Sequence, residues 1–247
     1  MNRPVAAVEV ERLSFRYPDG TQALNAASLT IREGEKVALM GPNGAGKSTL
    51  LLHLNGLLQG EGRVLVLGRP RRPVGPALEP LEPRNLKSIR RKVGLVFQNP
   101  DDQLFCPNLY DDVAFGPRNL GLAEEEVRAR VGRSLAAVGL SGLDGRMAYH
   151  LSWGEKRRAA IATVLALGAE ILALDEPTAY LDAAGRRDLV RCLKRIGGTQ
   201  ILATHSFGLV EELCERVVVM VEGRVVAEGT PEAIRSQRDA AERYGLA

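Results

Sequence analysis

A glycine-rich segment at residues 41–48 constrains this chain more than any other part of its sequence. Its letters, GPNGAGKS, fit the pattern GxxxxGK[ST] and lie between a strand-like run at residues 35–40 and a helical pattern at residues 47–58. In that context glycines let backbone N–H groups converge on phosphate oxygens, and the helix that follows presents its positive end to them. The segment therefore predicts a nucleotide-binding loop, with contacts from Asn43, Gly44, Ala45, Gly46, Lys47, Ser48 and Thr49.

Two side chains of this loop can act on a bound nucleotide. Lys47 can bridge the β- and γ-phosphates, so we expect it to be catalytic, and the Ser48 hydroxyl can ligate Mg²⁺. A glycine-rich turn that merely caps a helix has a similar composition. The flanking strand and helix favour phosphate binding over that alternative.

Acidic residues follow a buried strand later in the chain. Residues 171–174 read ILAL, and Asp175 and Glu176 come directly after them. Sheets of α/β proteins bind ligands at the carboxyl ends of their strands, so Asp175 can hold the Mg²⁺ shell. Glu176 can polarise a water molecule aimed at the γ-phosphorus. Such residues are also common helix caps, and it is the pairing with the phosphate loop that favours a catalytic site.

The rest of the chain alternates between strand-like and helical segments, which predicts an α/β fold. The strand-like runs are apolar on both faces, as in the buried strands of a sheet covered by helices. Strands are predicted at residues 35–40, 64–67, 93–97, 171–174 and 200–203, with a terminal hairpin at 217–221 and 224–227. Helices are predicted at residues 47–58, 124–138, 154–167, 183–196, 207–214 and 231–243. The prolines between residues 70 and 83 predict an irregular surface loop.

Composition narrows the class of protein. The net charge of the 247 residues is +3, and basic residues gather in short patches at 69–72 and 84–92, which we interpret mainly as solvated surface. No nucleic-acid partner is therefore expected. No apolar run approaches the roughly 18 residues of a membrane span, and the first residues lack the apolar region of a signal peptide. These features predict a soluble protein made in the cytoplasm.

Residues 151–158, LSWGEKRR, resemble the LSGGQ signature of ABC ATPases. The other motifs of that family have counterparts in the expected order, and the resemblance covers residues 5–235. Tyr17 resembles the adenine-stacking aromatic residue, Gln98 the Q-loop glutamine, residues 178–182 with Asp182 the D-loop, and His205 the H-loop histidine.

Each of these matches also has a physical interpretation. Tyr17 offers a flat face that can stack on a purine, although an exposed aromatic residue in a turn would look the same. Gln98 carries an uncharged amide that can reach both the metal and the water, so we expect it to be a metal ligand and a catalytic residue. His205 should lie at the carboxyl edge of the sheet, where it can hydrogen-bond the γ-phosphate as a catalytic residue.

The family resemblance implies a fold, cofactors and an oligomeric state. It implies a P-loop NTPase (RecA-like) core with a mainly parallel sheet, an antiparallel β subdomain and an inserted helical subdomain. In a single domain, the core would span about residues 1–99 and 166–230, the helical subdomain 100–165 and a C-terminal helix 231–244. ATP and Mg²⁺ are the expected cofactors.

In the family, the signature faces the γ-phosphate held by the other subunit. Ser152 and Gly154 would therefore contact a nucleotide across a dimer, either of identical chains or with a paralogous ABC ATPase. Trp153 and Glu155 depart from the LSGGQ pattern, and an indole at this position would be strained if it required a positive φ. Gly154 is present, so we expect activity to be retained.

Residues 96–105, VFQNPDDQLF, are similar to the extended Q-loop of energy-coupling-factor (ECF) importers and the CbiO-like ATPases of cobalt and nickel uptake. This similarity implies an ATP-hydrolysing subunit that energises import of a micronutrient, either a transition-metal ion or a vitamin. The implied partners are a membrane coupling protein and a substrate-capturing membrane subunit. The implied location is the cytoplasmic face of the cell membrane, as a peripheral protein.

An alternative is a soluble ABC ATPase that acts on nucleic acid or ribosomes. Relatives that maintain chromosomes insert long coiled coils between the phosphate loop and the signature, and this chain shows no sustained heptads there. Translation-factor relatives usually carry two cassettes in one chain, whereas this sequence holds one. Both features favour the importer.

Overall fold

Two β-sheets lie on either side of one helix, α1 (Lys47–Leu54). The computed structural model describes residues 5–68, 77–80 and 86–236. The larger sheet contains, in spatial order, β10 (Arg224–Gly229), β9 (Arg216–Val221), β3 (Lys36–Met40), β8 (Thr199–Ala203), β7 (Ile171–Asp175) and β6 (Val93–Val96). All neighbouring pairs in it are parallel except the β9–β10 hairpin. The smaller sheet is antiparallel and contains β2 (Gln22–Arg32), β1 (Ala6–Arg16), β4 (Glu61–Gly68) and β5 (Ala77–Pro80).

The larger sheet separates two hydrophobic cores, which explains why its strands are apolar on both faces. Along β3, Val37 and Leu39 pack into a core shared with α1 and the antiparallel sheet, whereas Ala38 and Met40 pack into a core shared with the helices on the other side. Side chains of a strand alternate between the two faces of its sheet, so a strand covered on both sides must be apolar throughout. The α/β, P-loop NTPase fold predicted from the sequence is confirmed.

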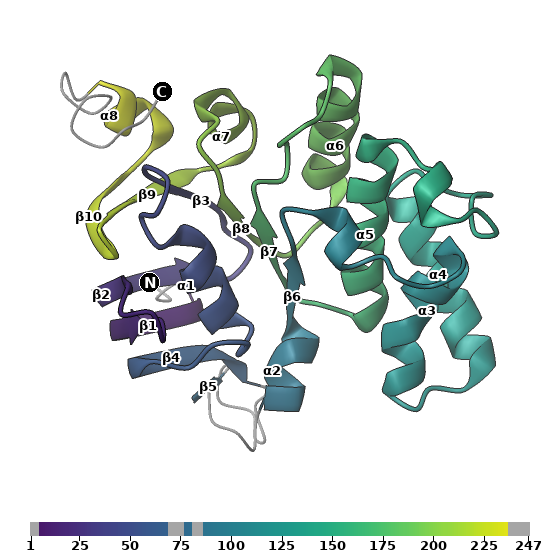
Figure 1. Cartoon of the computed structure of the whole chain (residues 1–247), viewed down its shortest axis with the longest axis horizontal. Helices are drawn as coiled ribbons and strands as arrows, with labels where there is room; N and C mark the ends of the chain where they lie inside the picture. Colours follow the sequence, from purple (N-terminus) through teal and green to yellow (C-terminus); the bar gives the residue numbers. More distant parts are fainter. Residues whose placement is uncertain (1–4, 69–76, 81–85, 237–247) are drawn as a thin grey trace.

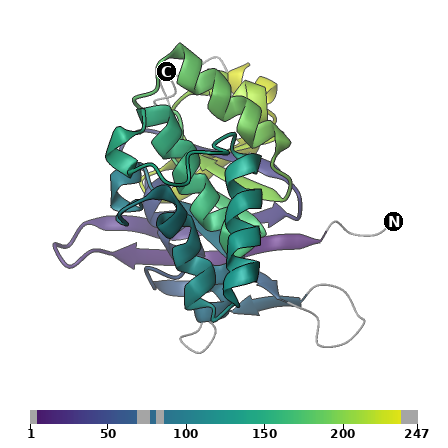
Figure 2. The same cartoon turned by 90° about the vertical axis from the view of Figure 1, so that its right-hand side faces the viewer.

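Helices between β6 and β7 form a group of their own at the far side of the larger sheet (Figures 1 and 2). They are α3 (Leu109–Asn119), α4 (Glu124–Ala137) and α5 (Trp153–Leu167), with the short 3₁₀ turns η2 (Pro100–Asp102) and η3 (Ala148–His150). The remaining helices are α2 (Leu86–Lys92), α6 (Ala183–Arg195), α7 (Phe207–Leu213) and α8 (Pro231–Arg235). α5 also packs against β6 and α6, so it joins this helical group to the sheet. The subdomain boundaries at residues 100 and 165 remain a proposal.

The structure corrects several predictions. The segment at residues 70–83 is not wholly irregular, because residues 77–80 form β5, an edge strand paired with β4. Residues 69–76 and 81–85 lie outside the described part of the chain. A strand of four residues that pairs along only one edge leaves little signal in the sequence. Its pairing with the neighbouring strand, rather than its own side chains, makes it a strand.

One helix prediction and one surface prediction also change. The helix predicted at residues 47–58 ends at Leu54, because Asn55 caps it and Gly56 adopts a positive φ of +76° that ends the helical path. The basic stretch at residues 84–92 is not simply solvated surface: residues 86–92 form α2, in which Ile89 and Lys92 are buried. Of the helix predicted at residues 231–243, the structure describes Pro231–Arg235, and residues 237–247 lie outside the described part.

In the described residues, no helix is both long enough and apolar enough to cross a bilayer.

Candidate functional site

Four parallel strands bring the predicted nucleotide-binding residues to one edge of the sheet. Leu39 of β3 and Asp175 of β7 both pair with Ala203 of β8, and Leu174 pairs with Val96 of β6. The residues that follow these strand ends therefore lie side by side. They surround a cavity of about 360 Å³ lined by Tyr17, Thr21, Ala23, Asn43, Gly44, Ala45, Gly46, Lys47, Ser48, Thr49, Gln98, Asp175, Glu176 and His205.

The loop at residues 41–48 has a backbone that its glycines make possible. Gly41 and Gly46 have φ values of +142° and +97°, which side chains rarely tolerate. A Cβ at Gly41 would collide with the carbonyl of Met220, and one at Gly46 with the carbonyl of Ala23. Gly46 is also the N-cap of α1 and supplies no side-chain cap, so the first N–H groups of the helix are left for a phosphate.

Lys47 is folded back over its own loop. Its side chain is buried, and Nζ donates to the carbonyl oxygens of Gly41 at 2.7 Å and Pro42 at 3.0 Å. Burial lowers the pKa of Lys47, and the carboxylates of Glu176 and Asp175 partly offset that effect. The ammonium group is thus held by neutral carbonyls and faces two carboxylates, an arrangement that leaves it ready to exchange a carbonyl for a phosphate oxygen.

The residues predicted to hold Mg²⁺ fit that ion. Oδ1 of Asp175 is buried and has no hydrogen-bond partner within the described part of the chain. Burial raises the pKa of Asp175, a hydrogen bond with Ser48 lowers it, and the nearby Glu176 charge raises it again. A hydroxyl and a carboxylate that face each other, with the exposed amide of Gln98 on the same cavity, are the oxygen donors that Mg²⁺ prefers.

Glu176 points along a different direction from Asp175, although the two are adjacent. Its φ of +41° lies in the left-handed region, and its N–H donates to the carbonyl of Ala203 at 2.8 Å. The carboxylate is then held by two residues of the next strand end: Oε1 lies 2.9 Å from Nδ1 of His205, and Oε2 accepts from the Thr204 hydroxyl at 3.3 Å. A strained backbone maintained by such contacts is typical of a catalytic position.

Neighbouring side chains hold the ring of Tyr17 in place, and this residue lines the cavity. Its hydroxyl lies 3.1 Å from Oγ1 of Thr49, and its edge packs against Phe15 with ring centres 5.0 Å apart. Phe15 in turn packs against the buried His53, whose Nδ1 lies 2.7 Å from the Thr49 carbonyl. Burial lowers the pKa of His53, so its ring is neutral at neutral pH. These contacts give His53 a structural role behind the Tyr17 ring.

Ser152, Gly154 and Asp182 lie elsewhere, around a second cavity of about 470 Å³. Ser152 caps α5 in a reciprocal capping box: its hydroxyl accepts the N–H of Glu155 at 3.3 Å, and the Glu155 carboxylate accepts the N–H of Ser152 at 2.8 Å. Trp153 begins the helix and does not adopt a positive φ, so an indole causes no backbone strain there. One chain therefore separates the predicted residues into two sites.

Asp182 and Gly154 bring the starts of two helices together. Asp182 is the N-cap of α6, where Oδ1 accepts the N–H of Gly185 at 2.7 Å. A Cβ at Gly154 would lie 3.3 Å from the Cα of Gly185, which shows how closely the two helix starts approach. The contact of Asp182 with a nucleotide remains a proposal, beside this structural role.

The sequence reading missed several residues at these sites. Thr204 orients Glu176, and a polar residue between Ala203 and His205 at a strand end is the signal that points to it. Tyr180 has a φ of +63°, is 78% exposed and contacts Trp153 edge-to-face with ring centres 5.9 Å apart. Its position inside the D-loop-like segment was visible in the sequence, but its contact with Trp153 was not.

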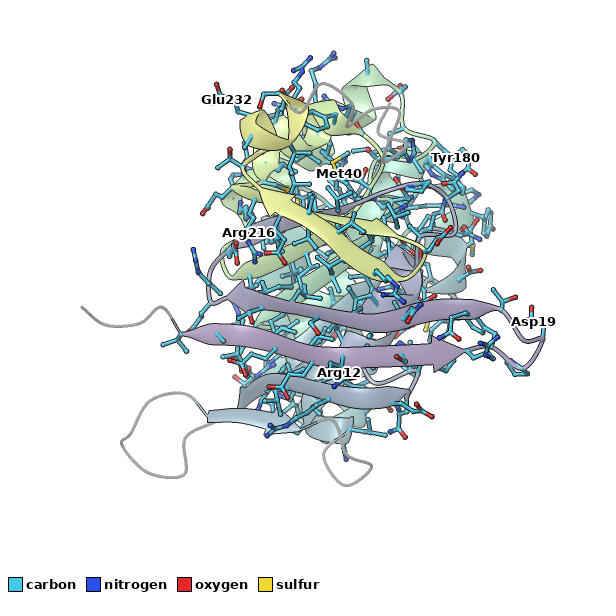
Figure 3. The ribbon with its side chains drawn as sticks, turned by 90° about the vertical axis from the view of Figure 1, so that its left-hand side faces the viewer. Arg12, Asp19, Met40, Tyr180, Arg216 and Glu232 are labelled. Carbon is cyan, nitrogen blue, oxygen red and sulfur yellow. The ribbon has the colours of Figure 1, made fainter. Side chains whose placement is uncertain are left out.

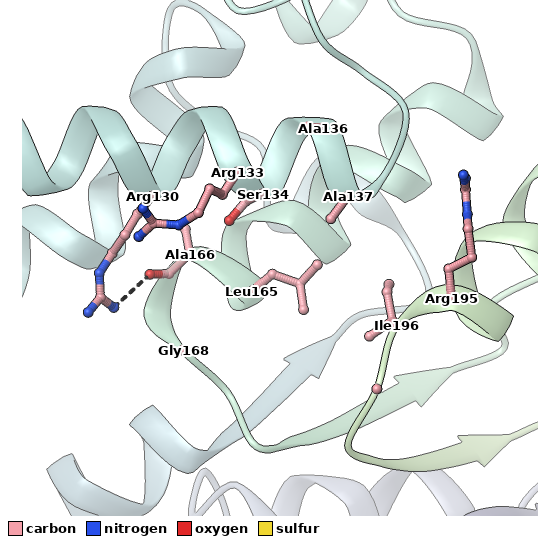
Figure 4. Close-up of a pocket in the computed structure, with 11 residues that line it drawn as sticks. Arg130, Arg133, Ser134, Ala136, Ala137, Leu165, Ala166, Gly168, Arg195 and Ile196 are labelled. Carbon is pink, nitrogen blue, oxygen red and sulfur yellow. Dashed lines mark hydrogen bonds between the residues drawn. The ribbon is translucent and has the colours of Figure 1, made fainter.

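A larger cavity, of about 670 Å³, lies between α4, α5 and α6 (Figure 4). Its charged residues do not converge on a common point, since Arg130 and Arg195 lie at opposite ends. Arg130 is already engaged, because it donates to the carbonyl of Ala166 at 3.2 Å and pairs with Glu126 at 2.8 Å. Size alone therefore does not make this cavity the site.

Known proteins are similar in sequence to this chain along most of its length. The sequence profile of the ABC transporter family matches residues 24–179. The energy-coupling factor transporter ATP-binding protein EcfA of Methanocaldococcus jannaschii is 45% identical over 243 residues, which cover 97% of this chain and 84% of that protein. The protein of the same name from Carboxydothermus hydrogenoformans is 48% identical over 244 residues, which cover 97% of this chain and 86% of that protein.

Solved structures share the fold. The cbiO1 protein of Clostridium perfringens, part of the ABC transporter complex cbiONQ, superposes with a TM-score of 0.81 at 38% identity, covering 97% of this chain and 94% of that one. An ATP-binding cassette solved as a dimer in a post-hydrolysis state with ADP and Pi gives a TM-score of 0.75 at 28% identity. That match covers 91% of this chain and 98% of the other.

Proposed function

The chain belongs to the ABC transporter family, and from this membership we propose that it is the ATP-hydrolysing subunit of an ECF-type importer. One observation carries the detailed proposal: the phosphate loop, Asp175, Glu176 and His205 line one cavity, whereas Ser152, Gly154 and Asp182 line another. Each cavity holds part of an ATPase site. The parts combine when two copies, or this chain and a paralogue, face each other.

In such a dimer, Ser152 and Gly154 of one copy meet the γ-phosphate held by the loop of the other. The N-terminus of α5 supplies the positive end of a helix dipole for this contact. The Ser152 hydroxyl, which donates to Glu155 at 2.8 Å, must turn from that carboxylate to the phosphate. The dimeric state of the solved post-hydrolysis cassette supports this arrangement.

Within one copy, the main residues of the first cavity have distinct tasks. Tyr17 stacks on the adenine, Lys47 leaves its two carbonyl partners for the β- and γ-phosphates, and the N–H groups at the start of α1 bind phosphate oxygens. Ser48, Asp175 and Gln98 would hold Mg²⁺, which when bound neutralises phosphate charge.

Hydrolysis needs a base for the attacking water, and Glu176 has the geometry for it. Its carboxylate is held on both oxygens by His205 and Thr204, so it faces the cavity in a fixed orientation. It can accept a proton from water as the water attacks the γ-phosphorus. His205, whose side chain is 67% exposed, reaches toward the opening of the cavity, where a ring that carries a proton on both nitrogens could donate to Glu176 and to the γ-phosphate together.

The membrane partner would dock beside Gln98. Two aromatic side chains that follow Gln98 in the chain are exposed to solvent: Phe105 is 64% exposed and Phe115 is 48% exposed. Their rings pack edge-to-face with centres 5.0 Å apart. Exposed aromatic pairs favour a protein interface. We propose that helices of the membrane coupling protein cover them, which places this chain at the cytoplasmic face of the membrane. The transported micronutrient, a transition-metal ion or a vitamin, remains a prediction because a separate subunit would capture it.

The test is co-purification from detergent-solubilised membranes, followed by ATPase assays of the isolated complex. Recovery of a polytopic membrane protein together with Mg²⁺-dependent ATPase activity is the expected result. Recovery without membrane partners, combined with ATPase activity stimulated by RNA, would support the nucleic-acid alternative instead.

A further inference from the structure

Among the fully buried side chains of the described residues, the largest belongs to a charged residue, Arg157 of α5. Its exposed fraction is 0%. Moving a guanidinium out of water is costly unless hydrogen bonds and opposite charges compensate, so a buried arginine needs a reason. In the sequence Arg157 stands between two other basic residues, Lys156 and Arg158, and nothing there distinguishes it from a solvated side chain.

Arg157 makes one strong hydrogen bond and lies within electrostatic reach of two carboxylates. Nη1 donates to the carbonyl oxygen of Phe97 at 2.7 Å, whereas Nε and Nη2 have no hydrogen-bond partner in the described residues. Burial lowers the pKa of Arg157 to about 10, with the charges of Asp175 and Glu176 acting in the opposite direction. The guanidinium therefore stays charged at neutral pH and interacts electrostatically with the carboxylates of the nucleotide site.

The residue that Arg157 holds is the one before Gln98, and it is held twice. The N–H of Phe97 donates to Oε1 of Gln103 at 3.2 Å. The amide of Gln103 is itself fixed to α5, because Nε2 donates to the Ala160 carbonyl at 3.0 Å and to Oγ1 of Thr163 at 2.8 Å. Both backbone polar groups of Phe97 are thus connected to α5, directly through Arg157 and indirectly through Gln103.

We propose that Arg157 is a positioning residue that sets the place of Gln98 from the helix that also carries the signature residues. Arg157 lies one helical turn after Gly154, so a shift of α5 that carries Ser152 and Gly154 toward the partner's nucleotide is transmitted to the Phe97 carbonyl. The ion pair between Lys156 and Asp101, at 2.7 Å, reinforces the same connection from the surface. This inference rests on the proposed role of Gln98 in the nucleotide site.

A purely structural arginine would affect stability without affecting Gln98, and three variants separate the two roles. Arg157→Met removes the charge and the donors, and Arg157→Lys keeps the charge with a shorter reach. Arg130→Met is the matched control. Like Arg157, Arg130 donates to a backbone carbonyl, but its acceptor is Ala166 in α5, far from Gln98. Each is measured in the assembled transporter for kcat and KM with Mg-ATP, and as nucleotide-free full chain for hydrogen exchange of residues 93–103.

For Arg157→Met we expect kcat to fall about tenfold or more while KM for ATP changes less than about threefold, the size of one lost charged hydrogen bond acting on positioning alone. Hydrogen exchange at residues 93–103 should accelerate in the same variant, and Arg157→Lys should recover part of both effects. Arg130→Met should leave both readouts unchanged. Wild-type kcat and wild-type exchange in a folded Arg157→Met protein would overturn the proposal, as would a loss no larger than that of the control at equal Tm.

Two further variants keep the outcomes distinct. If Arg157→Met does not fold, Arg157→Lys and Gln103→Leu carry the test, since each weakens one of the two connections to Phe97. Gln98→Ala tests the underlying function separately: unchanged kcat in that variant would contradict the role of Gln98. In that case faster exchange at residues 93–103 in the Arg157 variants would still show the contact, but unchanged kcat in them would reject its positioning role.

Discussion

Nδ1 of His205 lies 2.9 Å from Oε1 of Glu176, and the two residues follow the ends of adjacent parallel strands. The Glu176 side chain is 12% exposed and that of His205 67% exposed, so the carboxylate is set deep in the site and the imidazole toward its opening. Thr204 holds the other carboxylate oxygen at 3.3 Å. The carboxylate therefore has a fixed direction before any nucleotide arrives, which is the property that a general base requires.

Replacement of Glu176 by Gln should preserve ATP binding and nearly abolish turnover. The amide keeps the size of the carboxylate and can still accept one of its two hydrogen bonds, from His205 or from Thr204, but it cannot accept the proton, and a lost general base lowers kcat by about 10²–10⁴-fold. Steady-state phosphate release and binding of a fluorescent ATP analogue measure the two effects. The exposed Glu125→Gln in α4 is the control, and normal turnover in Glu176→Gln would remove that residue from the catalytic role.

Substitution of His205 by Ala should reduce kcat by about 10–100-fold and leave the affinity for ATP nearly unchanged. The alanine frees Oε1 of Glu176, which then samples other orientations, and it removes the proposed contact with the γ-phosphate. Combining His205→Ala with Glu176→Gln should add little to the loss in Glu176→Gln alone, because both changes act on the same step. Additive losses in single-turnover assays would mean that the two residues work independently.

Tyr17 offers a paired test of base stacking. Tyr17→Phe removes the hydroxyl that lies 3.1 Å from Thr49 and keeps the ring, so nucleotide affinity should stay within about twofold of wild type. Tyr17→Ala removes the ring and should weaken binding by about 1–3 kcal/mol. Isothermal titration with ATP and with inorganic triphosphate distinguishes the causes, since triphosphate has no base to stack. Equal weakening for both ligands would argue against stacking.

Glu155 places a carboxylate beside Ser152, where we propose that the partner's γ-phosphate arrives. Hydrogen bonds from Ser152 lower its pKa, so it is ionised at neutral pH. Glu155→Gln can retain the capping box while removing the like charge, and the ATP-induced dimer should tighten by about 0.5–1 kcal/mol. Sedimentation of Glu155→Gln in the Glu176→Gln background, with ATP, measures this. A weaker dimer would show that the carboxylate is needed for capping or for the contact itself.

An ion pair between the buried Glu35 and the partly buried Arg216 connects the two sheets and predicts a pH-dependent stability. Arg216 of β9, which is labelled in Figure 3, donates to Glu35 at 2.6 Å and to the carbonyl of Thr30 in β2. Burial by itself raises the pKa of Glu35, but the Arg216 guanidinium and the N–H of Arg32 outweigh it, and the net pKa lies below the ordinary 4.5. The pair therefore stabilises the fold above about pH 4.5, and this contribution is lost as the pH falls through the lowered pKa of the folded state.

Arg216→Met should lower the free energy of unfolding at pH 7 by about 3 kcal/mol, because it leaves the buried Glu35 carboxylate without its opposite charge, with the N–H of Arg32 still donating to it. Protonation then relieves the variant, so its deficit relative to wild type should narrow below about pH 4.5. Urea unfolding at pH 7 and at pH 4 measures the two differences. A deficit that is the same at both pH values would assign the loss to packing rather than to charge.

Local motifs accounted for much of the fold and of the candidate site. The strand–loop–helix at residues 41–48 was predictable because glycine conformations and helix starts depend on a few neighbouring residues. The strand ending at Asp175 and the N-terminus of α5 at Ser152 were predictable for the same reason. β5 was missed because its pairing with β4 specifies it, and the end of α1 was misplaced because Gly56 was treated as part of the helical pattern.

By itself, the sequence determined which backbone segments could bind phosphate, which strands of the larger sheet would be buried and which side chains had the right chemistry. The tertiary structure alone decided which of these side chains meet: it put His205 against Glu176, separated Ser152 from Lys47, and buried Arg157 completely while Lys156 and Arg158 stay partly exposed. The physical reason is the distance along the chain over which the deciding interactions act. Backbone conformation follows from interactions within a few residues, whereas burial and the meeting of side chains depend on strand order and on packing between segments far apart in the chain.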